Sequence, residues 1–197
     1  MSTPAGTDST RDRIVVAATA EFARHGIAGA RIERIAKTAR TSKERLYAHF
    51  RGKEELYATV IAREMTLVAE ATRLDVTDLP GYAGRVHDYF TAHPDRLRLM
   101  NWGRLELAGG TPPDPDDPIQ AAVLHKTEQL REAQKAGHLD PAWDPVDILM
   151  FVNQLAMSWA GQADLLPPGQ KERTAFLTAR RAAIVTAVQR LFPASAV

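Results

Sequence analysis

The sequence contains no cysteine, which excludes disulfides, thiolate catalysis and cysteine-ligated zinc. It has no run of 18 apolar residues, and its start, MSTPAGTDST, has neither a charged n-region nor an apolar h-region. We therefore expect no membrane span and no export, and a cytoplasmic protein. No segment shows the apolar and polar alternation of a strand, so we expect an all-α fold. The 197 residues, 45% of them hydrophobic, suffice for one ordinary core or two small ones.

Motifs of the common enzyme classes are also missing. There is no HExxH, no GxSxG and no glycine-rich phosphate loop. None of the six histidines has a second histidine four residues away, as a helical metal site would need. The acids of DPDDP (114–118) lack the glycine and the terminal glutamate of a calcium loop. We expect no enzyme, no metal and no cofactor, with a helical-bundle dehydratase or oxygenase as the alternative.

Positive charge is concentrated in residues 31–53. This segment carries eight basic side chains against two acidic ones, a net charge of +6, whereas the whole chain carries +1 and the remainder therefore −5. A local cluster of this sign favours a polyanionic partner, because each neutralised phosphate releases counterions. The alternative is an ordinary solvated face.

Helical periodicity and proline or glycine breaks predict about nine helices. Three form a small N-terminal unit and the others a larger bundle. The predicted helices span about residues 11–25, 31–39, 42–49, 54–74, 80–92, 95–108, 118–136, 145–164 and 170–192. We predict a flexible segment at 1–9, a helix-turn-helix domain at 10–54 and a helical effector-binding and dimerisation domain at 55–197. The first helix should stop at Gly26, and a loop rich in Pro and Asp should occupy 111–118.

The third helix carries the most informative pattern. Ser42, Leu46 and Phe50 stack on one side, so the basic and hydroxyl side chains between them point outward. The preceding helix ends about two residues earlier, which is typical of a helix-turn-helix. Thr41 or Ser42 can cap this helix, and TSKE (41–44) fits a capping box with Glu44 at N3.

The N-terminal region resembles the DNA-binding domain of the tetracycline-repressor (TetR) family over about 50 residues. The similarity is carried by Phe22 with His25-Gly26, by Ile35-Ala36, by the SKxxLYxHF pattern from Ser42 to Phe50, and by KEEL from Lys53 to Leu56. The resemblance implies that the outward side chains of the third helix face DNA and that Lys53 holds a phosphate. We expect Arg45 to read guanine, because a guanidinium can bind guanine O6 and N7 together, and we expect Tyr47 and His49 to contact the backbone. The predicted DNA contacts are Arg31, Arg40, Ser42, Lys43, Arg45, Tyr47, His49 and Lys53.

Two positions depart from the family pattern. Where the second helix usually has a Thr or Ser cap, this chain has Ala30 or Arg31, so the cap is absent or comes from backbone and water. Where the turn usually has glycine, this chain has Arg40, which either adopts a left-handed conformation or changes the turn. A phosphate contact of Arg40 would offset the strain.

The resemblance also implies a C-terminal domain that dimerises and binds a small hydrophobic effector. The segment over 145–164 is apolar on more than one face, and 170–192 carries a second apolar stripe, so these helices are the predicted homodimer interface. Predicted ligand contacts are Met100, Trp102, Leu105, His125, Phe151, Gln154 and Trp159. We expect a homodimeric repressor that binds a palindromic operator in double-stranded DNA, with nucleoid association when bound, and that an effector releases. A constitutive repressor or architectural protein without ligand, and an activator, are the alternatives.

Overall fold

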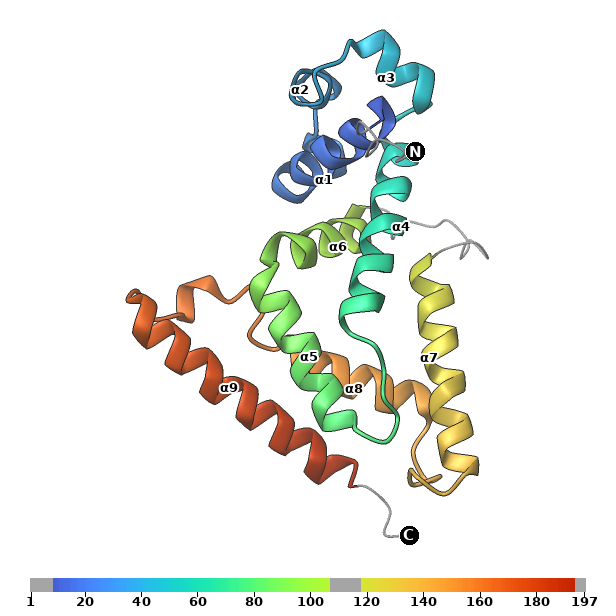
Figure 1. Cartoon of the computed structure of the whole chain (residues 1–197), viewed down its shortest axis with the longest axis vertical. Helices are drawn as coiled ribbons and strands as arrows, with labels where there is room; N and C mark the ends of the chain where they lie inside the picture. Colours follow the sequence, from blue (N-terminus) through green and yellow to red (C-terminus); the bar gives the residue numbers. More distant parts are fainter. Residues whose placement is uncertain (1–8, 107–117, 194–197) are drawn as a thin grey trace, which may run out of the picture. The chain divides into compact units, whose positions relative to one another are not determined.

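A computed structural model describes residues 9–106 and 118–193 of the chain. These residues form nine α-helices and one short 3-10 helix, η1, without a strand (Figure 1). The helices are α1 (Thr10–Gly29), α2 (Ile32–Thr38), α3 (Lys43–His49), α4 (Lys53–Ala71), α5 (Leu79–Ala92), α6 (Pro94–Glu106), α7 (Pro118–Lys135), α8 (Pro145–Met157), η1 (Ala163–Leu165) and α9 (Gln170–Leu191). The predicted all-α fold is confirmed.

Two helices depart from their predicted ends by four residues or more. α1 extends to Gly29 but is kinked at Gly26, which has φ 70° and therefore interrupts the helix where the sequence predicts its end. α8 stops at Met157, so the predicted helix over 145–164 is wrong in its last two turns. Gly161 there adopts φ 82°, and Pro167 and Pro168 follow the short η1. The predicted loop at 111–118, the end of the helix over 95–108 and almost all of segment 1–9 lie outside the described residues.

The described residues divide into two compact units. The first contains residues 9–65 and 95–106, and the second contains residues 66–94 and 118–193. The chain passes from one unit to the other inside α4 and again at the start of α6. The domain boundary predicted at residue 54 stays a prediction, since α6 and most of α4 group with the N-terminal helices by contact.

The first unit is built on one apolar core. Ile14 and Phe22 of α1, Ile35 of α2 and Leu46 of α3 are all fully buried. The ring of Phe22 packs edge-on against Tyr57 of α4, with the ring centroids 5.4 Å apart. Burial of these side chains leaves the opposite sides of α2 and α3 for solvent, as their apolar spacing predicts.

In the second unit, α5 packs against α8 and α9 (Figure 1). α8 contributes Ile148, Leu149 and Val152 to the core, each 1% exposed. α9 behaves differently, because only Ile184 and Val188 of its 22 residues are buried. A helix of this length therefore leaves most of its surface outside the core of its own chain. Within the described residues, no helix is long and apolar enough to cross a membrane.

Candidate nucleic-acid interface and ligand cavity

The turn between α2 and α3 is a Schellman motif. The Thr41 amide donates to the Ala36 carbonyl at 3.0 Å, and the Arg40 amide donates to the Lys37 carbonyl at 3.2 Å. Arg40 has φ 54° at the position where this motif usually has glycine. The predicted left-handed Arg40 is confirmed, and its conformation costs about 1–2 kcal/mol.

α3 begins with a cap from Ser42. The Arg45 amide donates to the Ser42 hydroxyl oxygen at 3.1 Å, which makes Ser42 the N-cap and Arg45 the N3 residue. Glu44 therefore stands at N2, and the predicted capping box with Glu44 at N3 is wrong. The Thr41 amide already donates to the Ala36 carbonyl in the Schellman motif, so it cannot donate to a Glu44 carboxylate as a capping box requires. The helix therefore begins one residue later. The Glu44 backbone amide and the Ser42 hydroxyl lower the pKa of the Glu44 carboxyl.

The start of α2 is held by a side chain from α1. Arg31, the N-cap residue, forms no side-chain cap. Glu21 instead accepts the Arg31 amide at 2.9 Å and the Arg34 Nε at 2.8 Å. Burial alone would raise the pKa of Glu21, but the bonds from Arg34 and Arg31 lower it overall. The prediction that this helix lacks a Thr or Ser side-chain cap is confirmed, and the bond from the Arg31 amide to Glu21 is an additional contact with a residue ten positions earlier.

The side chains that α3 directs outward are those the sequence predicts. Leu46 is fully buried, whereas Lys43, Arg45 and His49 are exposed and Tyr47 is 45% exposed. Ser42 is exposed as well, and its cap uses only an oxygen lone pair, so its hydroxyl proton can still be donated. α3 thus offers hydroxyl, imidazole, phenol and guanidinium groups to solvent, on a helix that starts five residues after α2 ends.

Four basic side chains around this turn are free of hydrogen bonds and ion pairs to the part of the chain that the structure describes. We call them the free cations, and they are Arg31, Lys37, Arg40 and Arg45. Lys37 is absent from the predicted DNA contacts. Its place on α2, directly after the buried Ile35-Ala36 pair, was the signal that could have added it.

Other cations in the segment already have partners. Lys43 Nζ donates to the Glu33 carboxylate at 2.6 Å, and this bond raises the pKa of Lys43 and lowers that of Glu33. Lys53 Nζ donates to the carbonyls of Ile27 and Ala28 at 3.2 and 3.0 Å. Lys53 therefore ties the start of α4 to the end of α1, and its phosphate contact stays a prediction.

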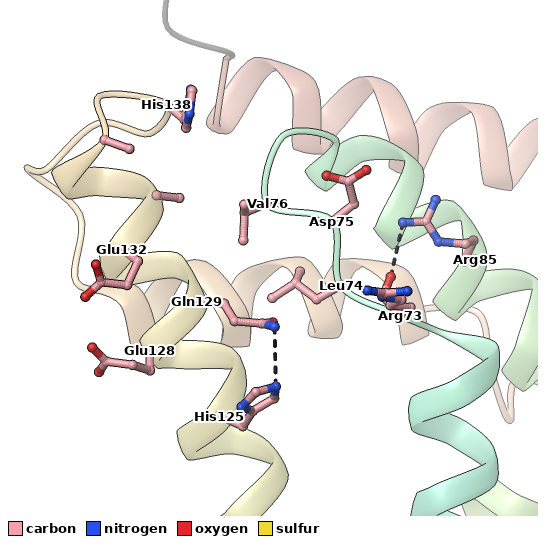
Figure 2. A pocket seen from close by; sticks show the side chains of 12 residues that line it. Arg73, Leu74, Asp75, Val76, Arg85, His125, Glu128, Gln129, Glu132 and His138 are labelled. Carbon is pink, nitrogen blue, oxygen red and sulfur yellow. Dashed lines mark hydrogen bonds between the residues drawn. The ribbon is translucent and has the colours of Figure 1, made fainter.

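A cavity of about 840 Å³ opens in the second unit, between the segment after α4 and helices α5 and α7 (Figure 2). Its lining is mixed: Leu74 and Val76 are apolar, whereas Arg73 and Arg85 are cationic. His125 Nε2 lies 3.3 Å from the Gln129 amide nitrogen in the same wall.

Of the seven predicted ligand contacts, His125 alone lines this cavity. Met100, Trp102 and Leu105 belong to the first unit, and Leu105 is 75% exposed. Phe151, Gln154 and Trp159 belong to the second unit but not to this lining. Trp159 packs edge-on against Phe176 at 5.3 Å. All seven residues, His125 included, stay predictions as ligand contacts.

Comparison with known families gives two matches that together cover most of the chain. Residues 14–60 match the family of bacterial regulatory proteins, tetR family, and residues 78–190 match a tetracyclin repressor-like C-terminal domain. The chain belongs to the TetR family of transcriptional regulators.

Individual relatives agree with this TetR assignment. The HTH-type transcriptional repressor SCO4008 of Streptomyces coelicolor is 39% identical over 153 residues, which cover 78% of this chain and 79% of the relative. The crystal structure of the putative transcriptional regulator SCO4942 from Streptomyces coelicolor is 56% identical with a TM-score of 0.78, covering 94% and 99% of the two chains. FadR from Bacillus subtilis, solved in complex with stearoyl-CoA, shares the fold at 16% identity, with a TM-score of 0.61 and coverage of 88% and 97%.

This TetR-family chain also exposes apolar side chains near its C-terminus. On α8, Val146 and Phe151 are 45% exposed and Met150 is 36% exposed, although the same helix buries residues on its other side. Leu191 at the end of α9 is 43% exposed. The prediction that α8 is apolar on more than one face is confirmed.

Proposed function

We propose that the protein is a homodimeric repressor that binds a palindromic DNA operator through α3 and is released by a small-molecule effector. The observation that carries the proposal is the set of free cations, Arg31, Lys37, Arg40 and Arg45, around an outward-facing helix. Unpaired guanidinium and ammonium groups gain most from phosphates, because counterions are released when they bind. This family membership makes DNA the expected polyanion.

Within the interface, the side chains divide by role. Arg45 projects from the first turn of α3 without an internal partner and can bind O6 and N7 of guanine with two parallel bonds. Arg31, Lys37 and Arg40 lie on α2 or at its ends, where contacts to phosphates position the protein without reading sequence. Tyr47 and His49 follow on α3 as backbone contacts. Ser42 can donate its hydroxyl proton to a phosphate oxygen.

Dimerisation follows from both the readout and the exposed apolar surface. A single seven-residue helix reads too few bases for selectivity, whereas two copies related by a two-fold axis read both half-sites of a palindrome. The exposed apolar residues of α8 and the largely unburied α9 supply a surface for a second copy. We infer that α8 and α9 of two chains form the interface.

Release by an effector is argued from the family and from the cavity. FadR, a protein of this fold, is known in complex with stearoyl-CoA, so the fold can hold a ligand with an apolar body. The cavity of about 840 Å³ lies in the second unit, and α4 continues from that unit into the first. A ligand that prefers one arrangement of α4 would shift the population of DNA-binding conformers, with a coupling free energy of typically about 1–3 kcal/mol.

Selection of bound duplexes from a random library tests the proposal, followed by affinity measurements over a range of salt concentrations. We expect a palindrome whose half-sites lie one helical turn or a multiple apart, and an affinity that falls steeply with salt. If the selection enriches no sequence, or enriches a site without two-fold symmetry, the proposal that a homodimer binds a palindromic operator is wrong. A thermal-shift screen of small hydrophobic molecules, scored by operator release, tests the effector.

A further inference from the structure

A half-buried lysine on α7 lies beside a phenol in the second unit. Lys126 Nζ donates to the Tyr82 hydroxyl oxygen at 3.0 Å and lies 4.9 Å from the centroid of the same ring. Tyr82 is only 1% exposed, and its hydroxyl donates onward to Asn153 Oδ1 at 3.0 Å. Three side chains from α7, α5 and α8 thus form one continuous hydrogen-bonded chain.

The charge of Lys126 is not compensated by the part of the chain that the structure describes. No ion pair of Lys126 occurs there, and its one acceptor is a neutral phenol. Burial raises the pKa of Tyr82 to about 12, so the phenol stays protonated and supplies no negative charge. Burial also lowers the pKa of Lys126. An ammonium has three donors, and a desolvated one is costly unless an anion accompanies it.

The chain of three side chains adjoins the ligand cavity. Gln129 lies one turn beyond Lys126 on α7, and Arg85 lies one turn beyond Tyr82 on α5. Both Gln129 and Arg85 line the cavity of about 840 Å³ (Figure 2). Lys126 itself does not line the cavity, but it lies on α7 directly after His125 and one turn before Gln129, which both do.

The acidic side chains of the cavity do not serve as counter-ions for Lys126. Each has a nearer partner: Glu128 pairs with Arg131, Glu132 with Lys135, and Asp75 accepts from Thr77. Arg73, in contrast, lines the cavity without a side-chain partner among the described residues. The unpaired charge beside the cavity is therefore positive.

We propose that Lys126, with Tyr82 and Asn153 behind it, recognises an anionic headgroup of the effector, a carboxylate or a phosphate, whose apolar body occupies the adjoining cavity. This inference rests on the proposed function, in which an effector binds the second unit. The anionic headgroup accepts a hydrogen bond from Lys126 Nζ and supplies the negative charge that the described residues do not place beside this ammonium. Tyr82 orients the ammonium and, through Asn153, is itself held in place.

The test compares ligands that differ only in the headgroup. Binding of straight-chain carboxylates from butyrate to palmitate, of aromatic carboxylates from benzoate to naphthoate, and of the corresponding phosphate monoesters is measured by calorimetry, each beside its neutral alcohol. For at least one of these apolar groups we expect the anion to bind about 10- to 100-fold more tightly than the alcohol. This is the gain in affinity that one charge-assisted hydrogen bond provides. The carboxylate and phosphate series distinguish the two headgroups.

Variants assign this preference to Lys126. Lys126→Met keeps the length of the side chain and should abolish the preference for the anion, whereas Lys126→Arg should retain most of it. Tyr82→Phe should weaken it severalfold, because the ammonium loses its orienting oxygen. Lys171→Met removes an exposed lysine of α9 that does not line the cavity, and should leave every affinity unchanged.

The outcomes separate this inference from the proposed function. If wild type and Lys126→Met both bind the operator but no anion in the series is preferred over its alcohol, the headgroup inference is wrong and the repressor reading stands. The inference is equally wrong if Lys126→Met keeps the preference, or if it only lowers the melting temperature of the unliganded protein. Loss of operator binding by wild type would instead reject the proposed function.

Discussion

α3 and α8 are both helices with one buried side, yet they present opposite chemistry to solvent. α3 buries Leu46 and exposes Lys43 and Arg45, whereas α8 buries Leu149 and exposes Phe151. Exposed cations gain little from a second protein surface but much from phosphates. Exposed apolar groups gain from contact with another apolar surface. The solvent side of each helix therefore indicates its partner, while the buried side only secures the fold.

The largest effect should come from placing charge on the apolar side of α8. Phe151→Asp should weaken the dimer by about 2–4 kcal/mol, the range for an aromatic anchor at the centre of an interface. Analytical ultracentrifugation would show monomers at concentrations where wild type is dimeric, and operator affinity should fall with it. Leu124→Asp is the matched control, because Leu124 is 68% exposed on α7 and outside the proposed interface. Equal dimerisation of wild type and Phe151→Asp would assign α8 another role.

The next effect concerns stability and contrasts a glycine of each unit. Gly26→Ala should lower the free energy of unfolding by about 2–3 kcal/mol, because φ is 70° and the new Cβ would clash with the Glu106 carboxylate and the Trp102 ring. Gly137→Ala has a similar φ of 80° but no atom within 4 Å of the new Cβ, so it should cost only about 1 kcal/mol. Chemical denaturation measures both, and equal costs would show that the contact with α6 does not restrain the kink.

The roles of the free cations can be separated by comparing Arg45→Ala on α3 with Lys37→Ala on α2. Arg45→Ala should lower operator affinity by about 1–3 kcal/mol and relax selectivity at one base pair of each half-site. Lys37→Ala should weaken specific and unspecific DNA alike and make the salt slope smaller by about one. Competition binding with operator and scrambled duplexes measures both quantities. Undiminished selectivity in Arg45→Ala would assign base readout to another residue.

The smallest effect should be a trade between stability and binding at the Schellman turn. Arg40→Gly removes the left-handed strain and should raise the free energy of unfolding by about 1 kcal/mol. It should also remove one phosphate contact, so that operator affinity depends less steeply on salt concentration. A more stable variant with unchanged DNA affinity would show that Arg40 makes no contact with the operator.

The sequence predicts the elements of the first unit well because short-range rules govern them. Apolar spacing places Leu46 in the core and the basic side chains outside, and the left-handed Arg40 is one of the two alternatives that the missing turn glycine leaves. The same rules fail for the cap of α3, where a hydrogen bond of the preceding turn moves the N-cap from Thr41 to Ser42. They also do not reveal that Glu21 of α1 accepts the Arg31 amide at the start of α2.

The candidate ligand site was less accessible to sequence reasoning. A stripe of Met and Trp looks the same whether it fills a core, faces a cavity or meets a second copy, and only His125 of the predicted set lines the cavity. Lys126 attracts no attention in the sequence, since a lysine on a helix is normally solvated. Its partners Tyr82 and Asn153 lie 44 residues before it and 27 after it, so only packing of α5, α7 and α8 brings them together.

The amino-acid sequence by itself determined the helical class, the family and the outward direction of the α3 side chains, because these depend on spacing within a few turns. Tertiary structure alone decided which cations keep a free charge, which apolar residues stay exposed and where a lysine is half-buried without an anion. The physical reason is that pairing and desolvation depend on atoms brought together from distant parts of the chain, and local patterns carry no record of those contacts.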